Sequence, residues 1–261
     1  MEKKKENPAK EKIEEKEEVE KDRKSGKGEK EEKGSKEKPE QDSEKESRIV
    51  ENWEPKTKLG KLVKEGKIKD IDEILDSNQK ILEEQIVDSL LDLKSELIFI
   101  GQAKGKFGGG KRRAWRQTQK KTKEGNIPKF STLAVVGDEN GHVGIGFGKA
   151  KETLPARDKA IRKAKLNIFK VTRGDGSFDS VGTENTSIPF RVEGKCGSVR
   201  VILYPAPPGT GLVVGRELKK VLRLAGIKDI YSKTFGRKRT SFNLVKACIE
   251  ALKKTTKGVP K

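Results

Sequence analysis

The first 47 residues cannot supply a hydrophobic core, because only four of them are apolar. Those four are Met1, Ala9, Ile13 and Val19. Burying so little apolar surface does not offset the entropy that a chain loses when it becomes ordered. We therefore predict that residues 1–47 form a disordered charged tail. The globular part then occupies about the last 210 of the 261 residues.

The positive charge of the chain is confined to its C-terminal part. The formal net charge is +19, but residues 101–261 hold 36 basic and 12 acidic side chains, a net +24. The segments before them, residues 1–47 and 48–100, carry net charges of −2 and −3. A compact body with this imbalance repels itself, and a polyanion that displaces its counterions relieves the repulsion. Nucleic acid is therefore the leading candidate partner.

Several other classes of protein are disfavoured by the same sequence. An anionic membrane surface would satisfy the charge, but the chain shows no apolar stripe opposite the basic residues and no lipidation signal. It also lacks a long apolar run or a secretion signal, so we expect a soluble intracellular protein without a membrane partner. Two cysteines and one histidine do not suffice for a disulfide framework or a structural zinc site, and we expect no cofactor or metal.

The hydrophobic pattern predicts an α+β fold with two small domains after a helical lead-in at residues 48–96. Residues 97–172 and 186–257 are the predicted domains. In the first, we expect three strands and a helix, at residues 97–103, 130–136, 142–147 and 155–169. In the second, we expect strands at 188–192, 199–204 and 227–232 and helices at 216–225 and 242–252. Asp138–Gly141 reads as a tight turn and Gly226 as a helix cap.

The long connection between the first two predicted strands, residues 104–128, is rich in cations and contains Phe107 and Trp115. Guanidinium groups can bind phosphates in a bidentate manner while aromatic rings stack on unpaired bases. The alternative is a disordered, solvated spacer. We predict RNA binding by the cations of this segment, which are Lys104, Lys106, Lys111, Arg112, Arg113, Arg116, Lys120 and Lys121.

Alternate glycines at Gly144, Gly146 and Gly148 remove the side chains from one face of the third predicted strand. Another backbone can approach such a face closely, and we predict that it is a phosphodiester chain. Lys149 and Lys151 would then bind phosphate near the amino end of the following helix. The alternative is a bent strand or a bulge whose glycines serve geometry alone.

The nucleotide-binding and catalytic motifs that we considered are incomplete. Neither Gly148-Lys149-Ala150 nor Gly194-Lys195-Cys196 has the Ser or Thr that a Walker loop requires. The glycines at 209, 211 and 215 miss the spacing of a dinucleotide fingerprint. His142, the only histidine, lies beside a turn glycine and shows no obvious pairing with a carboxylate and a hydroxyl in the sequence, so we expect an exposed hairpin residue. Cys248 is expected to fill the core and Cys196 to end a strand.

Taken together, several strings of the sequence resemble the small-subunit ribosomal protein family called S-five in the bacterial naming, in its archaeal and eukaryotic branch. They occur in the family's order across about residues 50–257, and the lead-in is what resembles that branch. The strings are residues 57–68, 136–152, 164–168, 197–201, 205–211 and 224–229.

The resemblance implies a first domain like a double-stranded-RNA-binding domain and a second domain with a left-handed β-α-β crossover. It implies a cytoplasmic, non-enzymatic constituent of the small ribosomal subunit, near the decoding region and the path by which messenger RNA enters. The partners would be small-subunit rRNA, neighbouring small-subunit proteins and messenger RNA. The family's long hairpin matches residues 104–128, which are longer here than in the family.

Two other functions compete with this interpretation. One is a free-standing RNA chaperone or regulator built on residues 97–170. The other is a small-molecule phosphotransferase, because metabolite kinases contain a fold like that of the second domain, and this hypothesis rests on fold analogy alone.

Overall fold

The computed structural model describes residues 53–77, 79–102, 112–175 and 185–257. A compact unit extends over Pro55–Lys261 and contains every helix and strand discussed below. The tail predicted at residues 1–47 lies outside the described residues. So do Lys104, Lys106 and Lys111 of the predicted RNA-binding set.

Three short helices make up the lead-in, as the helical spacing predicts: α3 (Lys58–Lys64), α4 (Ile71–Asp76) and α5 (Glu84–Leu90). Thr57 begins α3, because its hydroxyl oxygen accepts a hydrogen bond from the Gly60 amide at 3.1 Å. Each helix is too short to be stable alone, and apolar side chains hold it against the unit. The buried ones are Val63, Ile71, Ile74, Ile86 and Val87.

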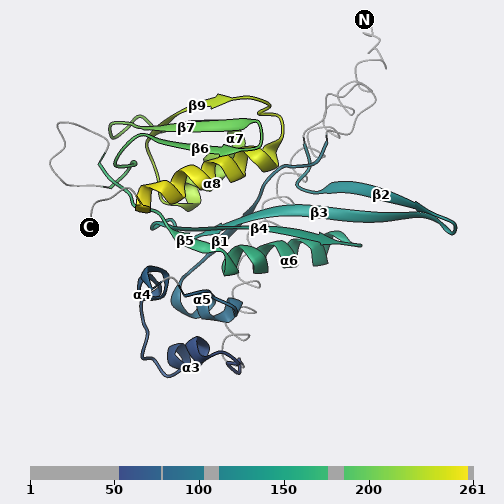
Figure 1. Ribbon diagram of the computed structural model, residues 1–261, viewed down its shortest axis with the longest axis horizontal. Helices are drawn as coiled ribbons and strands as arrows, with labels where there is room; N and C mark the ends of the chain where they lie inside the picture. The colour runs from purple at the N-terminus through teal and green to yellow at the C-terminus, as the bar shows by residue number, and fades with distance from the viewer. Residues whose placement is uncertain (1–52, 78, 103–111, 176–184, 258–261) are drawn as a thin grey trace, which may run out of the picture. The chain divides into compact units, whose positions relative to one another are not determined.

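The first sheet has the strand order β1-β3-β4-β5, with β2 paired to the first half of β3. All of these pairs are antiparallel. Helix α6 (Thr153–Leu166) lies along one face, as Figure 1 shows. The strands are β1 (Lys94–Leu97), β2 (Arg116–Thr122), β3 (Gly125–Gly137), β4 (His142–Ala150) and β5 (Ile168–Lys170).

The glycine face of β4 is covered by α6, so the prediction that a phosphodiester chain approaches it is wrong. A Cβ atom on Gly144, Gly146 or Gly148 would lie within 2.2 Å of a carbonyl oxygen of α6. Those oxygens belong to residues 164, 160 and 156, all alanines. The glycines recur every two residues along the strand, an advance of roughly 6.7 Å, and the alanines recur every four residues along the helix, an advance of roughly 6 Å. Each glycine therefore lies opposite an alanine. A backbone does approach these glycines closely, as predicted, but it is that of the protein's own helix α6 and not a phosphodiester chain.

The predicted first strand, 97–103, is placed too late in the chain. The strand is β1, which ends at Leu97. The Ile98 amide still donates to the Leu133 carbonyl of β3 at 2.9 Å, and the Phe99 amide then donates to the Glu217 carboxylate at 3.0 Å. The predicted helix at 155–169 is also displaced. It begins at Thr153 and ends at Leu166, and residues 168–170 pair with β4 as β5.

The segment predicted as the connection 104–128 contains an additional strand, β2, and β3 begins at Gly125 rather than at Phe130. Thr122 pairs with Gly125, so Lys123 and Glu124 form a two-residue turn. Gly125 has a φ of +123°, which suits glycine. Almost all side chains of β2 are exposed, so hydrogen bonds to β3 hold this strand rather than apolar burial.

The second sheet has the order β6-β7-β9-β8, in which only β8 and β9 are parallel among the described pairs. Helix α7 (Arg216–Leu224) connects the parallel strands and forms the β-α-β unit that the resemblance implies. Helix α8 (Ser241–Lys257) packs across β6 and β7. The strands are β6 (Val192–Cys196), β7 (Val199–Pro205), β8 (Leu212–Val213) and β9 (Ile230–Phe235).

Two strand predictions in this sheet need correction. Ile188 is fully buried, but the strand begins only at Val192 and continues to Cys196. The last strand begins at Ile230 rather than Ile227, because the Ile227 amide still donates to the helical carbonyl of Leu222. Gly226, with a φ of +76°, ends α7 as predicted.

The two sheets share one hydrophobic core. Leu133 and Val135 of β3 belong to the same buried cluster as Val201 of β7 and Leu222 of α7. Phe147 of β4 meets Phe242 of α8 edge to face, with ring centroids 5.5 Å apart. The face of the first sheet opposite α6 is therefore buried against the second sheet's helices.

We predict that Gly146→Ala destabilises the protein by about 3 kcal/mol or more, because the new methyl group would meet the backbone of α6 at 2.0 Å. Chemical denaturation followed by circular dichroism measures the effect. Lys149→Ala on the same strand is the control, since that side chain is exposed. Equal stability of Gly146→Ala and the wild type would contradict this packing.

Candidate nucleic-acid interface

A basic hairpin formed by β2 and the first half of β3 extends past the other strands of its sheet (Figure 1). We call the segment 112–130 the basic hairpin. It has seven basic side chains and one acidic side chain, Glu124. The basic ones are Arg112, Arg113, Arg116, Lys120, Lys121, Lys123 and Lys129, and all of them are exposed.

The strand register gives the hairpin a cationic face. Residues directly opposite each other in an antiparallel pair lie on the same face. Arg116 pairs with Ser131, and Ser131 pairs on its other side with Lys149. Lys129 pairs with Thr118, and Lys120 pairs with Ile127, two residues farther along. The cationic face therefore carries Arg116, Lys120, Lys129 and Lys149.

The spacing on this face suits a polyanion. Diagonal neighbours in an antiparallel pair are roughly 7–8 Å apart, so Lys129 lies near both Arg116 and Lys120. Like charges this close repel one another in the free protein, and phosphate groups would remove that repulsion. Lys129 was missed from the sequence because residues 104–128 read as a loop. The Gly125-Asn126 pair between two polar runs was the sequence signal that could have revealed the hairpin.

The remaining predicted cations lie beside this face or farther along the hairpin. Lys121 is two strand positions from Gln119, on the opposite face from Lys120. Lys151 follows β4 immediately and is exposed just before α6 begins. Arg113 lies at the base of the hairpin, where its carbonyl accepts a hydrogen bond from the Gly101 amide at 2.9 Å.

Arg112 joins the basic hairpin to the second sheet. Its guanidinium donates to the Arg239 carbonyl at 3.1 Å and to the Ser241 hydroxyl at 2.9 Å, at the start of α8. The basic loop Arg237–Arg239 therefore lies beside the base of the hairpin. This contact extends the positive surface from one sheet to the other.

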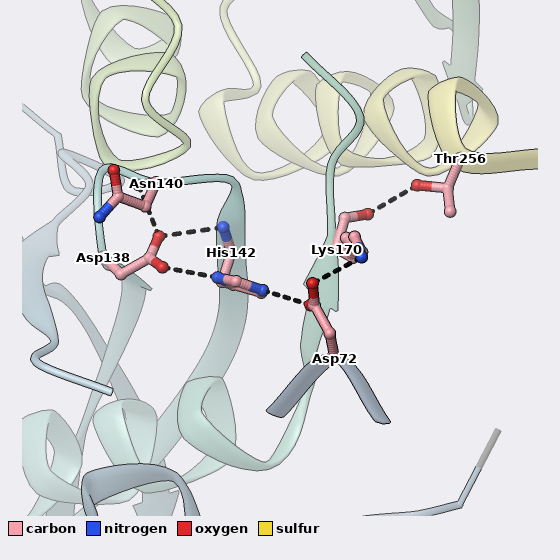
Figure 2. Close-up of polar contacts among 6 residues, drawn as sticks. All are labelled: Asp72, Asp138, Asn140, His142, Lys170 and Thr256. Atoms are coloured by element: carbon pink, nitrogen blue, oxygen red, sulfur yellow. Dashed lines mark hydrogen bonds and ion pairs between the residues drawn. The ribbon is translucent and has the colours of Figure 1, made fainter. Parts of the chain in front are cut away.

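His142 is not the exposed hairpin residue that the sequence suggested. Its Nδ1 lies 2.5 Å from a carboxylate oxygen of Asp138, and its Nε2 lies 2.8 Å from one of Asp72 (Figure 2). Both ring nitrogens thus face acceptors, and both can donate only when the ring is protonated. The side chain is 13% exposed. His142 joins α4 of the lead-in to the β3–β4 turn, which the sequence could not show because Asp72 is 70 residues away.

The charges of this cluster support one another. Burial opposes a charge on His142, but hydrogen bonds and attraction from the two carboxylates outweigh it, so the pKa of the imidazole is raised above 6.5. Burial alone would raise the pKa of Asp138 and of Asp72, yet hydrogen bonds, first of all from His142, hold both pKa values below normal. Lys170 also donates to Asp72, at 2.6 Å. We call Asp72, Asp138, His142 and Lys170 the clasp, because their contacts join α4 of the lead-in to β5 and to the β3–β4 turn.

The cysteines fit the roles expected of them. Cys248 is fully buried in α8, and burial raises the pKa of its thiol to about 12, so it stays protonated. Cys196 ends β6. Among the described residues, no group of His, Cys, Asp and Glu has a geometry that could hold a metal ion. In the same part of the chain, no helix is long and apolar enough to cross a membrane.

Two family descriptions match the part of the chain that contains these features. Residues 111–172, with the basic hairpin and α6, match the family described as ribosomal protein S5, N-terminal domain. Residues 194–258 match its C-terminal domain. The chain is also 52% identical over 206 residues to the small ribosomal subunit protein uS5 of Nanoarchaeum equitans, a match that covers 78% of this chain and 88% of that protein.

The chain belongs to the ribosomal protein S5 family. The small ribosomal subunit proteins uS5 of two other archaea support this assignment. The protein of Hyperthermus butylicus is 49% identical, over 81% of this chain and 93% of its own length. That of Methanocaldococcus jannaschii is 48% identical, over 78% of this chain and 88% of its own length. The predicted resemblance, including its archaeal type, is confirmed.

We predict that the stability of this S5 family member falls as pH rises above about 6.5, because a raised folded pKa makes the charge of His142 stabilising only while the ring is protonated. The stabilisation from this charge is complete at pH values below the ordinary pKa of histidine. It is lost as the pH rises through the raised pKa of His142 in the folded protein. Urea unfolding at a series of pH values measures it. His142→Gln should remove this part of the pH dependence, and identical profiles for the variant and the wild type would contradict the clasp.

Proposed function

We propose that the chain is a structural, non-enzymatic constituent of the small ribosomal subunit, that it binds small-subunit rRNA in the cytoplasm, and that it supports translation. The observation that carries the proposal is the cationic face of the basic hairpin on a body of net charge +24. The family relationship supports it, since the relatives named above are small ribosomal subunit proteins.

The exposed cations at and near the hairpin are the proposed phosphate ligands. Exposed lysines and arginines bind phosphates without reading sequence, and they position a protein on folded RNA. Gly144, Gly146 and Gly148 are excluded because α6 covers them. The proposed ligands are Arg112, Arg113, Arg116, Lys120, Lys121, Lys129, Lys149 and Lys151.

The family resemblance supports a proposal for where the hairpin lies within the subunit. We propose that it reaches rRNA near the decoding region, beside the path of incoming messenger RNA. Its cations would then help to hold or unwind the message, which is a mechanical role. Residues 97–172 and 186–257 are the proposed domains, and residues 48–96 the proposed lead-in.

The open face of the second sheet is a suitable contact for a neighbouring small-subunit protein. Tyr231 and Phe235 of β9 are 43% and 51% exposed. Tyr231 pairs with Tyr204, and the Arg191 guanidinium lies 5.2 Å from the centre of the Tyr204 ring. Exposed aromatic residues beside arginine are typical of protein interfaces. Helix α8 packs on β6 and β7 through glycine and alanine backbone contacts at Gly194, on the other face.

Sedimentation of a cell lysate tests the proposed assembly. We expect the protein in fractions that contain the small subunit and whole ribosomes. Recovery only in slow, ribosome-free fractions would refute the proposal and favour a free-standing RNA chaperone.

We predict that replacing Lys120, Lys121 and Lys129 together by Gln weakens binding of the full chain to RNA and flattens its salt dependence. Each phosphate contact adds roughly 0.7–0.9 to the slope of log affinity against log salt, so the slope should fall by about two to three. Electrophoretic mobility shifts at several salt concentrations measure it.

The matched control replaces Lys58, Lys61 and Lys69, which are exposed lysines of the lead-in, by Gln. It removes the same formal charge from a region of net charge −3. If both triple variants lost the same slope, general charge rather than the hairpin would account for binding.

A further inference from the structure

The base of the basic hairpin contains a hollow with a volume of about 420 Å³. Small-molecule sites in proteins have volumes of about 300–1,000 Å³, so the hollow is large enough for a small ring system. Two arginines, several amide side chains and two aromatic residues line it. Those used in the argument are Arg113, Trp115, Arg116, Gln117, Gln119 and Phe130.

The strand register places the glutamines of β2 and Phe130, which line this hollow, on the face opposite the cationic one, and Arg116 and Thr118 of the same strand also line it. Gln117 pairs with Phe130, and Gln119 pairs with Pro128, so these side chains share a face. It is the face on which Thr132, two residues after Phe130, donates to the Ala156 carbonyl of α6 at 2.8 Å. Arg116 and Lys129 lie on the other face. The hairpin thus has one side of cations and one side of aromatic and amide groups.

The exposure of Trp115 makes the hollow unusual. Its side chain is 38% exposed, although burial of an indole is strongly favourable. It lines the hollow together with Phe130, which is partly buried. Two flat rings in the lining of a polar hollow offer a surface on which another flat ring can stack.

The groups around the rings select the class of ligand. A glutamine side chain can both donate and accept hydrogen bonds, which suits the edge of a nucleobase. Arg113 and Arg116 offer charge to the phosphate attached to that base. Every base has a flat face that stacks on an aromatic ring, so such a site binds unpaired nucleotides with little preference for sequence.

We propose that this hollow binds an unpaired nucleobase of RNA, stacked on Trp115, while the arginines bind its phosphate. This inference rests on the proposed RNA-binding function and assigns a second role to the hairpin. The cationic face binds the backbone of folded RNA, and the hollow anchors a nucleotide that has left its helix. Binding then depends on bases as well as on charge.

The fluorescence of Trp115 tests the proposal. The chain has two tryptophans, so the full-length Trp53→Phe variant leaves Trp115 as the sole indole. The two probes are an oligoadenylate and an abasic ribose-phosphate oligomer of the same length, which carry the same phosphates. We expect the oligoadenylate to quench Trp115 and the abasic oligomer to bind without quenching. Equal effects of the two probes would overturn the proposal.

Binding by variants of the wild-type chain gives an independent measurement. Trp115→Ala should weaken binding of the oligoadenylate on the order of tenfold and leave the abasic oligomer unaffected, whereas Trp115→Phe should retain most of the affinity. Lys149→Gln is the matched control and should weaken both probes alike. Circular dichroism verifies that each variant is folded.

The outcomes separate the two hypotheses. If the wild type bound neither probe, the proposed RNA-binding function itself would fail. If it bound both with equal affinity, and Trp115→Ala changed neither, RNA binding would stand and the base site would be refuted. Should Trp115→Ala fail to fold, the quenching experiment still decides the question.

Discussion

The close packing of α6 on the glycine face of β4 determines how the rest of the unit Pro55–Lys261 is arranged. Carbonyl oxygens of α6 occupy the space where side chains of residues 144, 146 and 148 would stand. With one face of the sheet covered in this way, Leu133 and Val135 on the other face are buried against the second sheet's helices. The basic hairpin extends beyond both layers and is held mainly by its own hydrogen bonds.

The acidic lead-in neutralises part of the basic body from within the chain. Asp72 pairs with His142 and Lys170, and Asp88 pairs with Lys165 at 2.7 Å, where both side chains are largely buried. Exposed ion pairs contribute little stability, but buried pairs fix the relative position of the elements that carry them. The positive charge of the hairpin, with one acidic residue among seven basic ones, is left for a partner. The cations paired with the lead-in are thus engaged within the protein, whereas those of the basic hairpin are exposed.

Much of the fold could be predicted because local signals were strong. The lead-in helices, α6, α7 and α8 follow apolar residues at helical spacing, and Gly226 ends α7 as a glycine in the left-handed region should. The strand β2 could not be found in this way, because its side chains are exposed and it shows no apolar alternation. The predicted strand at 188–192 began too early, because Ile188 is buried although it does not belong to a strand.

By itself the sequence determined the segregation of charge, the α+β class and the family, because these depend on residue types and local spacing. Tertiary structure alone decided what covers the glycines of β4, which carboxylates hold His142, and which hairpin residues share a face. Each of these depends on contacts between residues far apart in the chain. A strand face without side chains can be approached by any backbone of suitable shape. Only the folded structure shows that helix α6 of the same protein covers this face.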